Sequence, residues 1–133
     1  MPLARISVPA HLSQELITVL ADAVQQGLVE TCGVPLDDQF QLISRFQPDA
    51  MILNPTFPDM NRSADACIVE ITFLRGRSDA QKRRLYARVV ATAADAGFAP
   101  DDIMISLTEN SPIDWSLGRG EAYDKRQDDN GTR

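Results

Sequence analysis

Hydrophobic and polar residues alternate in the first segment of the chain. Ala4, Ile6 and Val8 fall on one face of the stretch from Leu3 to Val8, and polar residues occupy part of the other face. This period of two is typical of a β-strand with one buried face. Pro9 follows and is expected to end the strand, because proline has no backbone N–H to donate.

A helix is expected next, because the hydrophobic residues now recur every three or four positions. Ser13 is suited to cap its first turn, and Gly33 is suited to end it. A turn that contains proline and a short strand through about Phe46 complete this part of the chain. The hydrophobic residues of the expected helix are Leu16, Ile17, Leu20, Val24 and Leu28.

The middle of the chain, residues 47–66, is rich in Pro, Asp and Asn. We expect a loop there, with one short edge strand at Met51 to Leu53. The next segment, CIVEITFLRGR, is dense in Val, Ile and Phe and predicts a strand over residues 67–77.

A second helix is indicated by a capping box formed by Ser78 and Gln81. Gly97 is expected to end this helix, and APDDIMISLTE, residues 99–109, predicts a turn followed by a last strand. The apolar face of the helix consists of Leu85, Tyr86, Val89, Val90 and Ala93.

The two halves of the chain repeat one order of elements: strand, capped helix, glycine, proline turn, strand. This order predicts a duplicated β-α-β unit, in which a crossover helix joins two parallel strands. The expected fold class is α+β, with a four-stranded, mainly parallel sheet and two helices on one face. Strands such as residues 67–74 are expected to be apolar on both sides, so the uncovered face of the sheet predicts an oligomer.

Length and composition are those of a single globular domain over residues 1–133, with a loose polar tail from about residue 124. The chain has 13 basic and 19 acidic side chains and a net charge of −6, which argues against nucleic-acid binding. No apolar run approaches the ~20 residues that a membrane span needs. The first residues lack the pattern of a signal peptide, and a cytoplasmic location is expected.

Cysteine and histidine are scarce. Cys32 and Cys67 lie far apart in the sequence, and we expect reduced thiols in the core rather than a disulfide. His11 is the one histidine and is expected in a solvated loop before the first helix. One histidine and two scattered cysteines give little support to a metal site or to histidine-based catalysis.

Pro2 is the first candidate for chemistry. If Met1 is removed, Pro2 carries a free secondary amine, and an α-amino group titrates near ~8, so it can act as an acid or a base at neutral pH. The alternative is that Pro2 is a proline tolerated at the beginning of a strand.

Arg75 and Arg77 form a second candidate site. In strand geometry, residues two apart point to one side, and here they stand directly before the beginning of a helix. Two guanidinium groups in that place are suited to hold a carboxylate. The alternative is a pair of solvated loop arginines.

Asp38 is a weaker candidate, because an Asp pair after proline is common in turns. The second half of the chain has the same pair, Asp101 and Asp102, after Pro100. Asp38 is therefore either a turn residue or an acidic partner for a nearby cation.

Beyond the last strand, ENSPIDWSLGRGEAY contains Trp115, the only tryptophan of the chain. A loop with an aromatic residue at its centre often covers a pocket or docks on a partner. The alternative is that Trp115 anchors the C-terminal arm to the core.

These features together resemble the tautomerase superfamily, and most of all its malonate semialdehyde decarboxylase group. The resemblance rests on the proline after Met1, the doubled β-α-β unit and the motifs VPLDDQF, RGRSDAQK and ENSPIDWSLGRG. It extends from Pro2 to about Ala122, and the last motif is its most specific part.

The resemblance implies the tautomerase-type fold, a homotrimer, and neither a metal ion nor an organic cofactor. It places the catalytic proline at Pro2, its acidic partner at Asp38, and the carboxylate-binding arginines at Arg75 and Arg77. It also implies a pocket wall formed by Trp115 and Leu117, where the second position is usually aromatic. The family's downstream phenylalanine corresponds to Asp124, which departs from the pattern.

The function that we expect follows from the protonation state of Pro2. A carboxylate at Asp38 favours the cation, a general acid, and the resemblance then implies decarboxylation of a small 3-oxo acid such as malonate semialdehyde. Nearby arginines favour the neutral amine, a general base suited to keto–enol tautomerisation of a compound such as phenylenolpyruvate. Hydration of haloacrylates is a further activity of related proteins. A trimeric binding module without catalysis is the more distant alternative.

Overall fold

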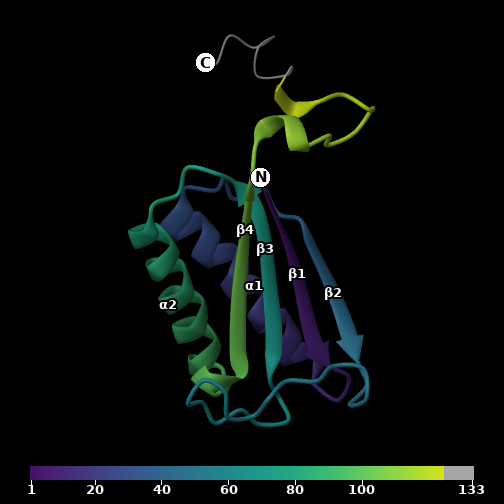
Figure 1. Ribbon diagram of the computed structural model, residues 1–133, viewed down its shortest axis with the longest axis vertical. Helices are drawn as coiled ribbons and strands as arrows, with labels where there is room; N and C mark the ends of the chain where they lie inside the picture. The colour runs from purple at the N-terminus through teal and green to yellow at the C-terminus, as the bar shows by residue number, and fades with distance from the viewer. Residues whose placement is uncertain (125–133) are drawn as a thin grey trace.

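The computed structural model describes residues 1–124, and the expected polar tail from residue 125 onward lies outside them. Four strands form one sheet in the order β2-β1-β3-β4, with both helices on one of its faces (Figure 1). The elements are β1 (Pro2–Pro9), α1 (Gln14–Cys32), β2 (Gln41–Phe46), β3 (Cys67–Leu74), α2 (Asp79–Asp95), a 3₁₀ turn η1 (Pro100–Asp102), β4 (Ile103–Asn110) and a second 3₁₀ turn η2 (Pro112–Asp114).

The duplication is visible in the strand pairing. β1 pairs with β2 in parallel and β3 pairs with β4 in parallel, each pair being joined by a helix. The two units meet where β1 and β3 run antiparallel, with Pro2 opposite Phe73. The expected α+β fold with a duplicated β-α-β unit is therefore confirmed.

The helix boundaries follow from local chemistry. The Ser13 hydroxyl accepts a hydrogen bond from the Leu16 N–H, which satisfies a free donor at the beginning of α1. Gly33 ends α1 with φ +68°, a conformation that glycine adopts without strain. Ser78 and Gln81 form the predicted capping box at the beginning of α2.

The core lies between the helices and the covered face of the sheet. The alternate residues Ala4, Ile6 and Val8 of β1 are at most 1% exposed, as the hydrophobic pattern predicts. α1 and α2 pack closely at Gly27, because a Cβ atom added there would lie 2.9 Å from Cγ2 of Val89. Burial of this hydrophobic surface is the main driving force of the fold.

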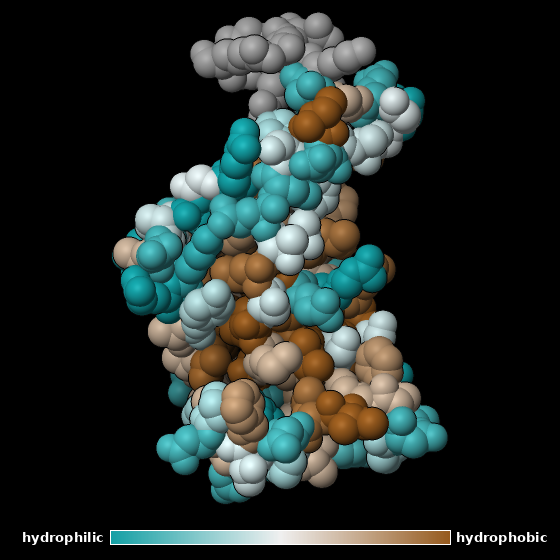
Figure 2. All heavy atoms as spheres, in the orientation of Figure 1, coloured by the Kyte–Doolittle hydropathy of each residue, from teal (hydrophilic) through white to brown (hydrophobic). Residues whose placement is uncertain are grey.

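The other face of the sheet carries no helix. Figure 2 shows hydrophobic side chains gathered over the strands in the middle of the face that it presents, with hydrophilic side chains along α2. β3 turns Glu70, Thr72 and Ile68 to the uncovered side, so the expectation that both of its sides are apolar is only partly right. The uncovered face is mixed, with hydrophobic positions between polar ones.

The expected strand at Met51 to Leu53 is wrong: these residues have no regular secondary structure. Nearby prolines withhold N–H donors, and the loop forms its own bonds instead. The side chain of Asn54 accepts from the N–H groups of Thr56 and Phe57, at 2.9 and 2.8 Å.

Within the described residues, neither helix is long and apolar enough to cross a membrane.

Candidate functional site

The candidate residues gather at one end of the sheet. β1 begins at this end, whereas β3 and β4 end there, because Pro2 pairs with Phe73 and Leu74 pairs with Asn110. The segment before β2 approaches from the other side, through the hydrogen bond from the Ala4 N–H to the Phe40 carbonyl, at 3.0 Å. Residues that are distant in sequence therefore meet around the amino terminus.

The amino terminus is bound to Asp38. The terminal ammonium of Met1 lies 2.8 Å from Oδ2 of Asp38, and the two side chains are 7% and 16% exposed. The other carboxylate oxygen, Oδ1, is buried and has no hydrogen-bond partner in the part of the chain that the structure describes. The carbonyl of Asp38 accepts from the side chain of Gln25 on α1, at 3.1 Å, which fixes the turn against the helix. Pro2 itself is fully buried, with Met1 in place.

Asp102, in the equivalent turn of the second half, has a different environment. It is 2% exposed, and its carboxylate accepts from the backbone N–H of Ser63 at 2.7 Å and from the hydroxyl of Ser63 at 2.5 Å. Both of its oxygens therefore have partners, and the residue ties the 47–66 loop to η1. The repeated turn thus supplies two carboxylates, and within the described residues only that of Asp38 has an oxygen without a hydrogen-bond partner.

The two arginines do not have the strand geometry that the spacing predicts. β3 ends at Leu74, and Gly76 between the arginines has φ +120°, which a side chain rarely tolerates. The Arg77 guanidinium donates to the carbonyls of Leu74 and Cys32, at 2.9 and 3.4 Å. It also stacks over Phe73, 5.1 Å from the ring centre.

Arg75 is exposed, and its backbone N–H donates to the carbonyl of Asn110 at 2.8 Å. Its guanidinium has no hydrogen bond or ion pair within residues 1–124. Within the described residues, the guanidinium of Arg77 is therefore held by the fold, whereas the side chain of Arg75 is exposed.

Glu109 lies beside the loop of residues 75–77, here called the arginine loop, and was not singled out by the sequence pattern. Its carboxylate forms an ion pair with Lys82 of α2. The hydrogen bond from Lys82 lowers the pKa of Glu109, and the Gly76 backbone and the charge of Arg77 act in the same direction. Glu109 follows Arg77 by 32 residues in the sequence and reaches the loop of residues 75–77 because β4 pairs with β3, with Glu109 opposite Phe73, so no local sequence signal could have identified it.

Trp115 belongs to an arm that leaves the end of β4 and projects beyond the sheet (Figure 1). Its indole Nε1–H donates to Oδ1 of Asn110, at 2.6 Å. The arm closes on itself through a bridge between Ser116 and Ala122. Leu117, the second residue expected in a pocket wall, is 42% exposed in the single chain.

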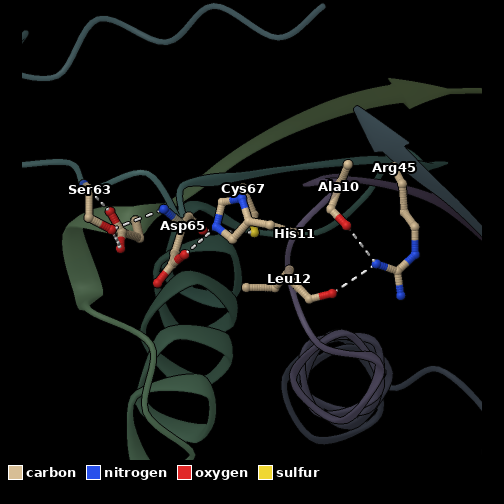
Figure 3. A network of polar contacts seen from close by, with 8 residues as sticks. Ala10, His11, Leu12, Arg45, Ser63, Asp65 and Cys67 are labelled. Atoms are coloured by element: carbon tan, nitrogen blue, oxygen red, sulfur yellow. Dashed lines mark hydrogen bonds and ion pairs between the residues drawn. The ribbon is translucent and has the colours of Figure 1, made fainter. Parts of the chain in front are cut away.

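A hollow of about 290 Å³ lies at the opposite end of the sheet, away from Pro2, and is lined by residues that include Pro9, Phe46 and Met51. His11 lies at this hollow and contacts Asp65, with 2.7 Å between Nε2 and Oδ1 (Figure 3). As expected, His11 is exposed in the segment before the first helix, and the contact links this segment to the 47–66 loop. We assign this network a structural role.

Both cysteines are free and buried, as expected from their spacing. Burial, and then the negative charges of Asp102 and Asp65, raise the pKa of Cys67 from 9.0 to about 12. Among the described residues, no group of three or more His, Cys, Asp and Glu side chains is placed to hold a metal ion.

Comparison with known proteins identifies the family. The family model described as "Tautomerase enzyme" matches residues 38–118. "Probable tautomerase YrdN" of Bacillus subtilis (strain 168) is 30% identical, over 92% of this chain and 95% of the relative. "Probable tautomerase YusQ" of the same organism is 27% identical, over 92% and 97%. The chain therefore belongs to the tautomerase family and is a tautomerase-superfamily enzyme.

Within this superfamily, the chain is similar to malonate semialdehyde decarboxylases. The FG41 malonate semialdehyde decarboxylase inhibited by 3-bromopropiolate superposes with a TM-score of 0.86 and 33% identity, over 98% of this chain and 97% of the other. A second malonate semialdehyde decarboxylase gives a TM-score of 0.86 and 31% identity, over 95% and 98%. Native fused 4-OT, at 18% identity, has a TM-score of 0.75 over 92% and 97%, and shares the fold.

Proposed function

We propose that this protein, once Met1 is removed, decarboxylates a small 3-oxo acid such as malonate semialdehyde, with Pro2 as general acid. The observation that carries the proposal is the position of the amino terminus on Asp38, whose Oδ1 is buried and has no hydrogen-bond partner among residues 1–124. A carboxylate in this place stabilises a positive charge on the adjacent amine. The similarity to two malonate semialdehyde decarboxylases supports the choice of substrate.

The proposed reaction needs a proton donor near the carbonyl oxygen of the substrate. The protonated Pro2 amine donates a hydrogen bond to this oxygen while the bond between the carboxylate carbon and C2 breaks. The electron pair of that bond moves into an enolate, and CO₂ leaves. Pro2 then supplies the proton that converts the enolate into the aldehyde product, and water restores the proton to the amine.

Arg75 and Arg77 have unequal parts in this proposal. The exposed guanidinium of Arg75 binds the substrate carboxylate and turns it out of the plane of the carbonyl group, so that the breaking bond aligns with the carbonyl π-system. Arg77 gives two of its donor groups to backbone carbonyls, so it holds the loop and adds positive charge with its remaining N–H groups. Trp115 and Leu117 are proposed to cover the apolar part of the substrate.

We further propose a homotrimer in which the uncovered sheet faces pack against one another. The mixed face of the sheet, with hydrophobic residues between polar ones, supports this assembly. One of the solved structures with the same fold, at 19% identity, is a fused 4-OT trimer.

Keto–enol tautomerisation, with neutral Pro2 as general base, is the second candidate. It is favoured by the two curated relatives that are probable tautomerases, and by the positive charge of the arginines near the amine. Hydration of haloacrylates is a side activity of the same site, since one of the similar decarboxylases is also described with a hydratase activity. A binding module without catalysis is the function left if Pro2 never becomes the terminal residue.

The deciding experiment compares the protein with and without Met1, with each form verified by mass. Malonate semialdehyde, phenylenolpyruvate and 3-haloacrylates are assayed with both forms. We expect decarboxylation only without Met1, because an amide nitrogen at Pro2 cannot act as an acid. Equal rates in both forms would exclude Pro2 as the catalytic group. Protein without Met1 that tautomerises phenylenolpyruvate but does not decarboxylate malonate semialdehyde would favour the tautomerase function.

A further inference from the structure

Asn110, the last residue of β4, is bound from two sides of the candidate site. Its backbone carbonyl accepts from the Arg75 N–H at 2.8 Å, and its side-chain Oδ1 accepts from the Trp115 indole at 2.6 Å. Asn110 itself is half-buried. One residue therefore contacts both the loop that carries the exposed Arg75 and the arm that carries Trp115.

The contact to Trp115 is the one that sets the place of the ring. An indole N–H can only donate, and a partly buried indole needs an acceptor. The other hydrogen bonds of Trp115 are made by its backbone within the arm, to Pro112 and Tyr123. In the part of the chain that the structure describes, the Asn110 side chain is thus the polar group that joins the ring to the sheet.

The contact to Arg75 fixes the other half of the site. Register pairing puts Asn110 opposite Leu74, so the residue that follows Leu74 emerges beside the end of β4. The backbone carbonyl of Asn110 binds the arginine loop, and its side chain binds the indole ring of Trp115. Because Asn110 is the last residue of a paired strand, both groups are held in place relative to the end of β4.

We propose that Asn110 is a positioning residue that holds Trp115 at a fixed place relative to Arg75, so that the carboxylate and the apolar body of one small substrate are bound together. This rests on the proposed function, in which both residues contact the same substrate. Supporting groups of this kind matter because small displacements of a site residue reduce its contribution to binding and rate.

The test uses protein without Met1 and three variants. Asn110→Leu removes the acceptor, Asn110→Asp keeps an oxygen in the same place, and Thr108→Val is a matched control on the same strand and the same face. Trp115 is the only tryptophan, so its fluorescence reports directly on the ring. We expect a red-shifted emission and stronger acrylamide quenching in Asn110→Leu, and values close to wild type in the other two.

Activity and binding test the coupling to Arg75. We expect kcat/KM for malonate semialdehyde to fall roughly three- to tenfold in Asn110→Leu, the effect of one lost hydrogen bond, and to recover in Asn110→Asp. The affinity for malonate, a carboxylate that mimics the substrate, should fall by a similar factor. If Asn110→Leu does not fold, Trp115→Phe removes the donor instead and should give the same loss of malonate affinity.

The outcomes separate this proposal from the proposed function. Unchanged fluorescence and unchanged malonate affinity in Asn110→Leu would overturn the positioning role, whatever the reaction is. A shifted fluorescence with wild-type malonate affinity would overturn the coupling to Arg75, as would a wild-type protein that does not bind malonate. Absence of decarboxylation in wild type, with fluorescence and malonate affinity changed as expected, would overturn only the proposed reaction.

Discussion

Asp38 and Asp102 are the same residue type in equivalent turns, but their surroundings differ. Asp102 is buried with hydrogen bonds from Ser63 to both oxygens, so its charge is used to hold a loop. Asp38 has one oxygen at the amino terminus and one that has no hydrogen-bond partner in the described part of the chain. A buried carboxylate oxygen without a donor is costly, which is a reason to look for a function there.

The charge of Asp38 should decide between acid and base chemistry at Pro2. In Asp38→Asn, loss of the negative charge lowers the pKa of the Pro2 amine, so less of the acid form is present at neutral pH. We expect slower decarboxylation and equal or faster enol tautomerisation, measured as pH–rate profiles of protein without Met1. General damage to the fold would lower both rates.

Asp37→Asn is the matched control, because Asp37 is exposed in the same turn. Asp102→Asn is unsuitable, since it disturbs the contacts with Ser63. If Asp38→Asn and Asp37→Asn behave alike, Asp38 is an ordinary turn residue.

Replacement of Arg75 and of Arg77 should have different effects on activity and thermal stability. We expect Arg75→Ala to lower kcat/KM on carboxylate substrates by about ten- to a hundredfold without loss of thermal stability, because a charge-assisted hydrogen bond to substrate disappears. Arg77→Ala should also lower the melting temperature, because it removes two hydrogen bonds and the stacking on Phe73. Kinetics and thermal denaturation of both variants check this, and wild-type kinetics in Arg75→Ala would make it a solvated loop residue.

Cys67 should remain unreactive in the folded protein. Its pKa of about 12 keeps the thiol protonated, whereas an unfolded chain ionises it near 9.0, so this group reduces stability as the pH rises from about 9 towards 12. We expect iodoacetamide at pH 8.5 to modify Cys67 in denaturant but not in the native state, as measured by peptide mass. Equal modification in both states would contradict its burial.

At the scale of elements, the chain is well described by its hydrophobic pattern. Both helices, their caps and the parallel pairing of each unit could be predicted, because burial and capping are local in sequence. The edge strand at Met51 to Leu53 could not be excluded in this way, since a strand also needs a partner. The prediction that Arg75 and Arg77 continue the strand is wrong. The sequence shows a glycine between them, but it does not show that β3 ends at Leu74.

In the candidate site, too, residue types could be predicted from the sequence, whereas contacts between distant residues could not. Pro2, Asp38 and the arginines could be proposed from residue types and the family resemblance. The contact of Met1 with Asp38 and the two bonds to Asn110 depend on strand register and on an arm beyond the sheet. Those are distances between residues far apart in the chain, and the sequence does not contain them.

Gly27 tests the packing of the two helices. Ala at this position favours the helix by about 1 kcal/mol, but its Cβ would lie 2.9 Å from Cγ2 of Val89, and overpacking of this kind costs about 1–3 kcal/mol. We expect Gly27→Ala to lower the midpoint of urea unfolding, whereas Gln26→Ala, on the exposed side of the same helix, should leave it nearly unchanged. A stabilised Gly27→Ala would show that the helices can separate.

For the whole molecule, the uncovered sheet face is the feature that remains to be accounted for. We expect sedimentation velocity at micromolar concentration to give a trimer. Ile68→Lys places a charge on that face and should shift the protein towards monomers. Thr18→Lys, on the exposed side of α1, should leave the oligomeric state unchanged. A stable wild-type monomer would contradict the proposed assembly.

The burial of the amino terminus also limits when Met1 can be removed. β1 lies inside the sheet between β2 and β3, and the Met1 side chain is 7% exposed, so an aminopeptidase has little access once β3 has paired. A ribosome makes about 5–20 residues per second, so the residues up to Leu74 are complete roughly 4 to 15 s after synthesis begins. Removal of Met1 is therefore expected to happen on the nascent chain, and a molecule that folds first keeps its methionine. Folded protein that retains Met1 should resist an aminopeptidase that readily trims it in denaturant.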